Sequence, residues 1–250
     1  MRKSTYLTAI FIMTFLSMSA HAQQEEHLVG LYFFDDEKGD EVIDSSGNGN
    51  NGIFQGGVKR ADGYFKGGLD FNGVDAFVEI PDSESLALTD GLTIAMWIYL
   101  RSYSTAGGVG VTKETSYKAG VRDHKGMMVR ATTAGGAWAD NSVDGGTAVP
   151  LEEWHHVAAT YDAASGDAIV YVDGEEDARG NFSGEIVPNG SVVWIGRGNA
   201  PYFDGIYDEV AIWNVALSRE EIVEAMNTLH VVEPLGKLSS TWGRMKVAYW

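Results

Sequence analysis

Residues Leu92 to Leu100 (LTIAMWIYL) constrain the fold of this chain more than any other segment. Both sets of alternating side chains are largely apolar, which is typical of a strand buried between two layers. The segments Leu28–Phe34 and Trp154–Tyr161 have the same character. Shorter strands are expected over Ala76–Ile80, Gly126–Ala131, Ala168–Val172, Val192–Gly196 and Ile206–Trp213, with clusters of Asn, Asp, Gly and Ser between them. The pattern predicts two packed antiparallel sheets.

Two short motifs predict where local elements turn or begin. The dipeptide Asp173-Gly174 follows an expected strand, and because both residues tolerate positive φ it predicts a tight hairpin. Ser218-Arg219-Glu220-Glu221 is a capping box, in which the Ser hydroxyl and the Glu carboxylate satisfy free amides at a helix start. A short helix is therefore predicted from Arg219 to about Asn227.

The composition excludes several kinds of site. Cysteine is absent, which removes disulfides, zinc–thiolate sites, iron–sulfur clusters and cysteine nucleophiles. The chain has 18 basic and 35 acidic residues, a net charge of −17, and such a surface repels nucleic-acid phosphates and anionic membranes. No nucleic-acid partner is expected, whereas divalent cations and neutral ligands are compatible with this charge.

The first 22 residues have the three parts of a signal peptide. Basic Arg2 and Lys3 precede an apolar run over Tyr6–Met18, and Ala20-His21-Ala22 fits a signal peptidase site. The alternative is an uncleaved membrane anchor, for which the apolar run is short. We expect a signal peptide over 1–22, a secreted mature chain that starts at Gln23 and has no transmembrane span, and an extracellular or periplasmic location.

The rest of the chain divides into a short linker, one domain and a tail. Residues 23–27 form the linker, and 28–230 contain neither an internal repeat nor a Pro- or Ser-rich break, so one domain is expected there. The tail over 231–250 mixes basic and aromatic residues: Lys237, Trp242, Arg244, Lys246, Tyr249 and Trp250. An extra strand, a disordered end and a docking signal are all compatible with that tail.

Six phrases in register resemble the LamG-like jelly-roll family of the concanavalin A-like lectin and glucanase superfamily. They are GLYFFDDEKGDEVIDSSGNGNNG (30–52), GGLDFNGVDAFVEIPDS (67–83), LTIAMWIY (92–99), EEWHHVAATYD (152–162), IVYVDGEE (169–176) and FDGIYDEVAIWNVALSREEI (203–222). The resemblance covers residues 28–230. It implies an all-β fold, a two-sheet antiparallel jelly-roll sandwich whose chain ends meet on one sheet, with one short C-terminal helix.

Catalysis is not expected. Glucanases of this fold take their carboxylates from a strand reading Glu-x-Asp-x-x-Glu, and that spacing is absent. Glu79 comes nearest, but Pro81 interrupts the strand before Asp82. The adjacent pair His155-His156 points to opposite faces of a strand and so cannot grip one ion. No Gly-x-Ser-x-Gly nucleophile elbow is present.

A structural calcium ion is expected from the oxygen-rich loop over residues 35–51. Hard cations bind carboxylate, amide and carbonyl oxygens. In jelly rolls that resemble this one, calcium joins this early loop to the last strand, where the phrase Gly-Ile-Tyr-Asp-Glu-Val supplies an Asp. The ligands expected here are Asp35, Asp44, Asn50 and Asp208. The alternative is that the Asp, Asn and Gly residues mark plain turns.

Ligand contacts are expected from residues in loops, because a rigid sandwich holds its loops in position. The candidates are Tyr117, Trp138, Arg197 and Tyr202, whereas Trp97, Trp154, Trp194 and Trp213 are assigned to the core. The interpretation is a secreted, non-catalytic module that binds a glycan or an extracellular protein, with a structural calcium ion. A glycoside hydrolase of the same fold and an adhesion module of the cell envelope are the alternatives.

Overall fold

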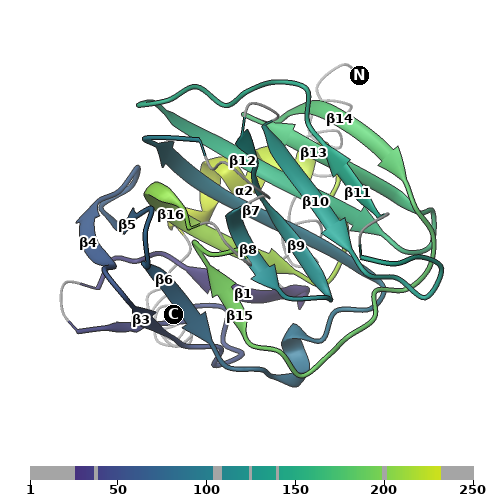
Figure 1. The fold of residues 1–250 in the computed structure, drawn as a ribbon, viewed down its shortest axis with the longest axis horizontal. Coiled ribbons are helices and arrows are strands. Elements are labelled where there is room, and N and C mark those ends of the chain that lie inside the picture. Colours follow the sequence, from purple (N-terminus) through teal and green to yellow (C-terminus); the bar gives the residue numbers. More distant parts are fainter. Residues whose placement is uncertain are drawn as a thin grey trace, which may run out of the picture.

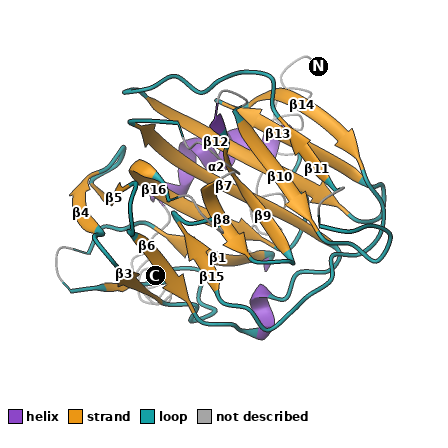
Figure 2. Ribbon diagram, in the orientation of Figure 1, coloured by secondary structure: helices purple, strands orange, loops and turns teal. Residues whose placement is uncertain are grey.

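The predicted strands form two antiparallel sheets, and the computed structural model describes them over residues 26–36, 39–103, 109–123, 126–138, 141–198 and 202–231 (Figures 1 and 2). Sheet A has the order β14 (Glu175–Asn181), β13 (Asp167–Val172), β12 (Trp154–Asp162), β7 (Gly91–Leu100), β16 (Asp204–Trp213), β5 (Gly67–Asn72) and β4 (Lys59–Asp62), and β1 (Leu28–Tyr32) also pairs with β16. Sheet B has the order β11 (Ser142–Asp144), β10 (Met127–Ala131), β9 (Tyr117–Val121), β8 (Val109–Lys113), β15 (Val193–Ile195), β6 (Phe77–Ile80), β3 (Gly52–Gln55) and β2 (Glu41–Val42). The all-β jelly-roll sandwich is confirmed, and its first and last strands meet on sheet A.

The expected signal peptide over 1–22 and the tail beyond residue 231 lie outside the described residues. Within the described part, no helix is long and apolar enough to cross a membrane.

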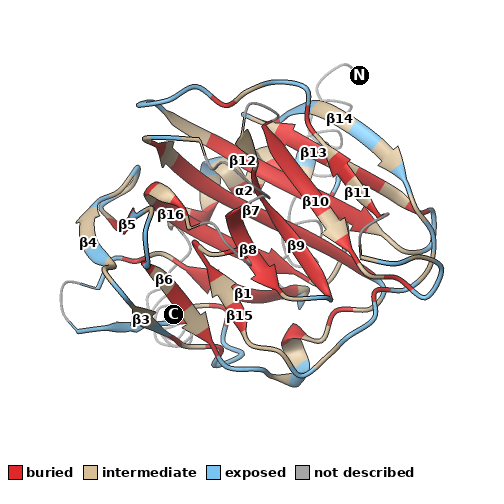
Figure 3. Cartoon of the chain, viewed as in Figure 1, coloured by how far each residue is buried: buried red, intermediate tan, exposed pale blue. Residues whose placement is uncertain are grey.

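The core lies between the two sheets because alternate side chains point to opposite faces of a strand. On β7, Ile94, Met96 and Ile98 point inward, and they share one apolar cluster with Val111 and Val129 of sheet B. Figure 3 shows this as buried central strands, whereas β4 and β14 at the rims are partly exposed. Burial on both faces explains why β7 lacks a polar side.

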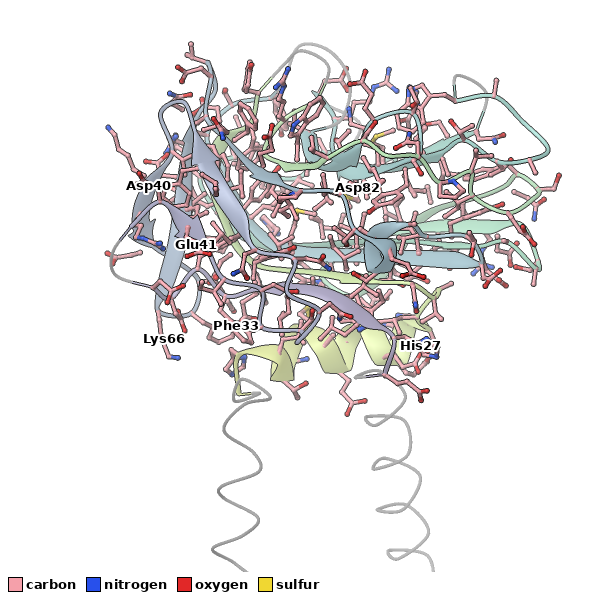
Figure 4. The ribbon with its side chains drawn as sticks, turned by 90° about the horizontal axis from the view of Figure 1, so that it is seen from below. His27, Phe33, Asp40, Glu41, Lys66 and Asp82 are labelled. Atoms are coloured by element: carbon pink, nitrogen blue, oxygen red, sulfur yellow. The ribbon has the colours of Figure 1, made fainter. Side chains whose placement is uncertain are left out.

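A helix forms a third layer on the outer face of sheet A. The small side chains of Ala95, Ala158 and Ala211 leave room there for α2 (Arg219–Thr228), whose Ile222 packs against them. Figure 4 shows α2 outside the layers of strands, on the side where His27 lies. The predicted capping box is present, since the Ser218 hydroxyl accepts from the Glu221 amide and the Glu221 carboxylate accepts from the Ser218 amide.

The predicted hairpin is also present. Asp173 and Gly174 both have positive φ, at 50° and 75°, as a tight turn between β13 and β14 requires. The Asp173 carboxylate accepts from the His156 amide at 2.9 Å and contacts His155 Nδ1 at 2.8 Å. The two histidines therefore lie on β12, as predicted, and both contact the turn residue Asp173.

Eight strands of the structure were not expected from the sequence: β2, β3, β4, β5, β8, β9, β11 and β14. Most are short, and β14 reads EEDARGN, which has no apolar alternation. Their residues adopt extended structure because neighbouring strands supply the hydrogen bonds.

Candidate functional site on the outer face of sheet B

One line of side chains crosses all eight strands of sheet B. Cross-strand pairing places residues of neighbouring strands directly opposite one another, and here the pairs join without a break from β11 to β2. The residues are Ser142, Arg130, Lys118, Thr112, Trp194, Glu79, Ile53 and Glu41. We call this line the sheet B row.

The sheet B row faces away from the core of the sandwich. The residues that flank it in sequence, such as Ala119 and Val129, belong to the core, so the row points to the opposite side. No helix in the described part of the chain covers this face, because α2 packs on sheet A. Thr112 and Lys118 are nonetheless 0% and 7% exposed. A ligand would therefore meet side chains that have already lost most of their water.

Polar atoms of the sheet B row lack hydrogen-bond partners. Ser142 Oγ, Arg130 Nε, Thr112 Oγ1 and Trp194 Nε1 are all buried and unpartnered. A buried polar atom without a partner costs about 1–3 kcal/mol, and folded proteins contain few of them. Four of the unpartnered atoms of the described residues thus lie in one line on this face.

Three cationic side chains gather at one end of the row. Lys118 and Arg130 are cross-strand partners, and Arg122 follows β9. Burial lowers the pKa of Lys118 to about 8, and repulsion by Arg130 and Arg122 adds to this, against a weaker attraction by Glu114. Arg122 donates from Nη1 to both carboxylate oxygens of Asp144 at 3.0 Å.

Aromatic rings lie beside the cations. The Arg197 guanidinium is 4.2 Å from the ring centre of Trp194, 4.8 Å from that of Phe77 and 5.7 Å from that of Tyr202. At the other end of the row, the Arg130 guanidinium is 5.7 Å from a ring centre of Trp138. Such contacts hold a guanidinium over a ring face, so rings and cations form one surface.

Of the four predicted ligand residues, Arg197 and Tyr202 lie together, Trp138 lies beside Arg130 of β10, and the fourth is corrected. Arg197 and Tyr202 pair across a short bridge, and Trp138 lies against Arg130. Tyr117 is wrong as a ligand contact, because it lies on β9 and is fully buried in the core, where its hydroxyl donates to the Leu86 carbonyl at 3.2 Å.

Sequence reasoning missed the middle of the row. Trp194 was expected in the core, yet it is half-buried on the outer face, since Val193 and Ile195 on either side of it point inward. Alternation along the short strand could have revealed this. Lys118 had no such signal, because β9 was not expected.

In the described part of the chain, no carboxylate lies directly opposite Glu79 on a neighbouring strand, and Glu41 lies two strands away along the row. The cross-strand partners of Glu79 are Trp194 and Ile53. Two carboxyl groups about 5 Å apart are required by a retaining enzyme, and about 6.5–9.5 Å by an inverting one.

The four predicted calcium ligands fall into two groups. Asp44 accepts hydrogen bonds from the Leu31, Ser46 and Asn50 amides and from the Ser46 hydroxyl, at 2.9–3.0 Å. Asn50 bonds the Val29 carbonyl through its amide. Across the described residues, no three His, Cys, Asp or Glu side chains converge as a metal site requires. This corrects the expectation that the four residues form one site, since Asp44 and Asn50 form hydrogen bonds within their own loop and with β1.

Asp35 and Asp208 lie at a bulge of β16, where Glu209 has φ of 48° and the pairing with β7 shifts. Asp208 accepts from the Phe65 and Glu209 amides at 2.8 and 2.7 Å, and Asp35 contacts Lys66 Nζ at 2.9 Å. Burial raises the pKa of Asp208 to about 7, and burial with repulsion by Asp208 and Asp35 raises the pKa of Glu209 to about 8. Glu209 Oε2 is buried without a hydrogen-bond partner. We call Asp35, Asp208 and Glu209 the acidic bulge.

Residues 72–223 match the concanavalin A-like lectin/glucanases superfamily. No curated protein matches the chain in sequence.

Three solved structures illustrate the proteins that have a similar fold. One is domain 4 of AbnA, a GH43 extracellular arabinanase from Geobacillus stearothermophilus, in complex with arabinotriose (TM-score 0.64, 20% identity, 79% of this chain and 97% of that one). Another is the binding domain of Paraclostridial Mosquitocidal Protein 1 (0.64, 18%, 82% and 53%). A third is botulinum neurotoxin type C, whose cell entry depends on two ganglioside molecules (0.65, 12%, 84% and 53%). The chain spans about half of the two toxin chains, and these identities establish the fold alone.

Proposed function

The chain belongs to the concanavalin A-like lectin/glucanases superfamily, and from that premise we propose that it is a secreted, non-catalytic module that binds carbohydrate on the outer face of sheet B. The observation that carries the proposal is the sheet B row, with its four buried and unpartnered polar atoms. Fold alone does not determine function, so the proposal rests on this surface.

A saccharide matches the chemistry of the row. Sugar hydroxyls both donate and accept hydrogen bonds, as Ser142, Arg130, Thr112 and Trp194 require. Trp194 and Trp138 add ring faces, which orient a ligand by contact with its apolar side. The arabinanase domain of similar fold was solved with arabinotriose, which supports this ligand class. A protein partner fits less well, because the row is polar where a protein interface would have an apolar centre.

We also propose that calcium binds at the acidic bulge and has a structural role. The support is that Glu209 Oε2 is buried and has no hydrogen-bond partner. The pKa values of Glu209 and of the adjacent Asp208 are both raised. A hard cation takes carboxylate oxygens, so these residues and Asp35 fit it better than Asp44 does. In the described arrangement the three carboxylates do not converge as a metal site and Asp35 contacts Lys66, so binding requires that contact to open and the carboxylates to move together.

Affinity electrophoresis in gels that contain plant and animal polysaccharides, followed by a reducing-end assay, tests the proposal. We expect retarded migration without release of sugar. Trp194→Ala removes a ring of the row and is expected to weaken retardation about tenfold, which corresponds to about 1.4 kcal/mol. Tyr64→Ala is the matched control, because Tyr64 is an exposed ring that stacks on Trp97 of sheet A.

Thr112→Val is a second variant, and it changes the row without removing a large packed side chain. It removes one unpartnered hydroxyl from the row and is expected to weaken binding without lowering the melting temperature. Loss of retardation in Tyr64→Ala but not in Trp194→Ala would move the site to sheet A. Sugar release that a Glu79→Gln change abolishes would establish a hydrolase instead.

A further inference from the structure

Lys118 and Arg130 make one end of the sheet B row positive, whereas Glu79 and Glu41 lie toward its other end. The whole chain has a net charge of −17, yet Lys118, Arg130 and Arg122 lie close enough together for mutual repulsion to affect the pKa of Lys118. Like charges directly opposite each other destabilise a sheet. An acidic protein that places Arg130 opposite Lys118 therefore bears a local cost.

The neighbouring carboxylates do not remove that cost. Asp144 is bound to Arg122 through both oxygens. Among the described residues, no carboxylate forms an ion pair with Lys118 or Arg130. Glu114 attracts Lys118 only from a distance. Two cations in the row thus have no anionic partner in the described part of the chain.

The other buried lysine of sheet B shows that the chain can pair such a group. Lys113 is fully buried on β8, and its ammonium is bound to the Asp82 carboxylate. Lys118 is almost as buried on the neighbouring strand, five residues along, and makes no such bond. Burying a charge without a partner is costly, so the contrast indicates that the partner of Lys118 comes from outside.

The hydroxyls beside the two cations complete a site for an oxyanion. Ser142 is the cross-strand partner of Arg130, and Thr112 is that of Lys118. Both hydroxyls are unpartnered, as is Arg130 Nε. Charge-assisted hydrogen bonds from guanidinium and ammonium groups to carboxylate or sulfate oxygens are about twice as strong as neutral ones. Lys118 and Arg130 can therefore approach one anionic group from neighbouring strands, and the two hydroxyls join them once the side chains that cover these hydroxyls move.

We propose that Lys118 and Arg130, flanked by Ser142 and Thr112, bind the carboxylate or sulfate of an acidic saccharide. This inference rests on the proposed function and names the ligand class of the same surface. The neutral part of the sugar chain then continues along the row toward Trp194. The acidity of the remaining surface disfavours any long polyanion, so the ligand expected is a saccharide with few acidic groups, and a nucleic acid is the competing ligand to be tested.

Matched pairs of ligands test the proposal with the full chain. The probes are an oligogalacturonate and the same oligosaccharide after methyl esterification, then a sulfated galactan and its desulfated form. Calorimetry and affinity electrophoresis report binding of each, and a single-stranded DNA oligonucleotide serves as the phosphate polyanion. We expect the acidic member of at least one pair to bind about tenfold or more tightly than its neutral counterpart. The pair that shows the difference distinguishes carboxylate from sulfate.

Lys118→Met and Arg130→Met should each reduce that preference about tenfold or more, because each removes a charged hydrogen bond. Arg179→Met removes the same charge from β14 of sheet A, where Arg179 pairs with Glu176, and should leave the preference unchanged. Lys118→Met is expected to melt no lower than the wild type, since it relieves repulsion. A melting curve therefore separates lost contacts from lost folding.

Three outcomes contradict the proposal in different ways. Equal binding of acidic and neutral saccharides overturns the acidic ligand but leaves carbohydrate binding intact. Binding of the DNA oligonucleotide as tightly as the acidic sugars overturns the choice of saccharide. Absence of binding to every saccharide refutes the proposed function itself, together with this inference.

Discussion

The acidic bulge and the sheet B row both leave buried polar atoms without partners, but the two regions have opposite charge. At the bulge the unpartnered atom is Glu209 Oε2, and Asp208 and Asp35 add to the negative potential around it. In the row the unpartnered atoms lie beside Lys118 and Arg130. The net charge of −17 therefore agrees in sign with the acidic bulge but not with the cationic end of the row. We propose a cation as the ligand of the bulge and an anion as the ligand of the row.

Removing the charge at the bulge should have the largest effect. The folded protein holds the pKa of Glu209 well above that of the unfolded chain, at about 8. Stability from this group is therefore full below about pH 4.5 and is lost as the pH rises toward the folded pKa. Without metal, Glu209→Gln should raise the free energy of unfolding on the order of 5 kcal/mol at pH 9 and little at pH 5, since the rise of the pKa from 4.5 to about 8 corresponds to about 1.4 kcal/mol per unit.

Urea unfolding of both proteins in EDTA at the two pH values measures this difference. Glu84→Gln is the control, because Glu84 is exposed at the start of a short 3₁₀ helix. An equal effect of Glu209→Gln at pH 5 and pH 9 would mean that ionisation of the Glu209 carboxyl group does not destabilise the folded protein.

Calcium should stabilise the protein through the acidic bulge and not through the sheet B row. A ligand that binds only the folded state stabilises it by about 2.7 kcal/mol at a hundredfold excess over Kd. We expect calcium to raise the melting temperature of the wild type and of Lys118→Met, but not of Glu209→Gln. An unchanged melting temperature in the wild type, with no metal by elemental analysis, would show that the acidic bulge binds no calcium.

A pair of threonines compares the outer faces directly. The Thr93 hydroxyl on sheet A donates to the Val215 carbonyl at 2.6 Å and accepts from the Leu217 amide at 2.8 Å, whereas the Thr112 hydroxyl on sheet B has no partner. Thr93→Val should cost about 1–3 kcal/mol, because a buried amide loses its acceptor, and Thr112→Val should be neutral or stabilising. Chemical denaturation measures both, and equal costs would mean that Thr112 is satisfied in solution.

The smallest effect is expected at the helix that covers sheet A. Ser218→Ala removes the cap of α2 and should cost about 1 kcal/mol. It should leave saccharide binding unchanged, because α2 lies on the opposite side of the sandwich from the row. Thermal melting and affinity electrophoresis check the two parts. Weaker binding in this variant would show that α2 affects the sheet B row and that the two faces are not independent.

Much of the fold could be predicted because its signals are local. The alternation over Leu92–Leu100 corresponds to β7, Asp173-Gly174 forms the hairpin, and the capping box at Ser218 starts α2. Each signal lies within a few residues of the element that it predicts. The polar and glycine-rich strands, such as β14, had no comparable signal.

The candidate site was predicted only at its margins. Arg197, Tyr202 and Trp138 stand out in the sequence as rings and a cation in loop-like contexts. Tyr117 looked the same but is buried, because the strand that holds it was not recognised. A side chain's face on a strand depends on the strand's register, and a shift of one residue reverses it.

By itself, the sequence determined the sandwich, its hairpin, its helix and the absence of cysteine chemistry. The sheet B row was decided only by tertiary structure, since β15 and β6 join the consecutive strands β8 to β11 to the distant strands β2 and β3. The bulge that turns Asp208 and Glu209 toward Asp35 likewise arises from pairing with β7. Register between distant strands is set by the packing of the whole core. The sequence of a single strand does not specify which residues will lie opposite it.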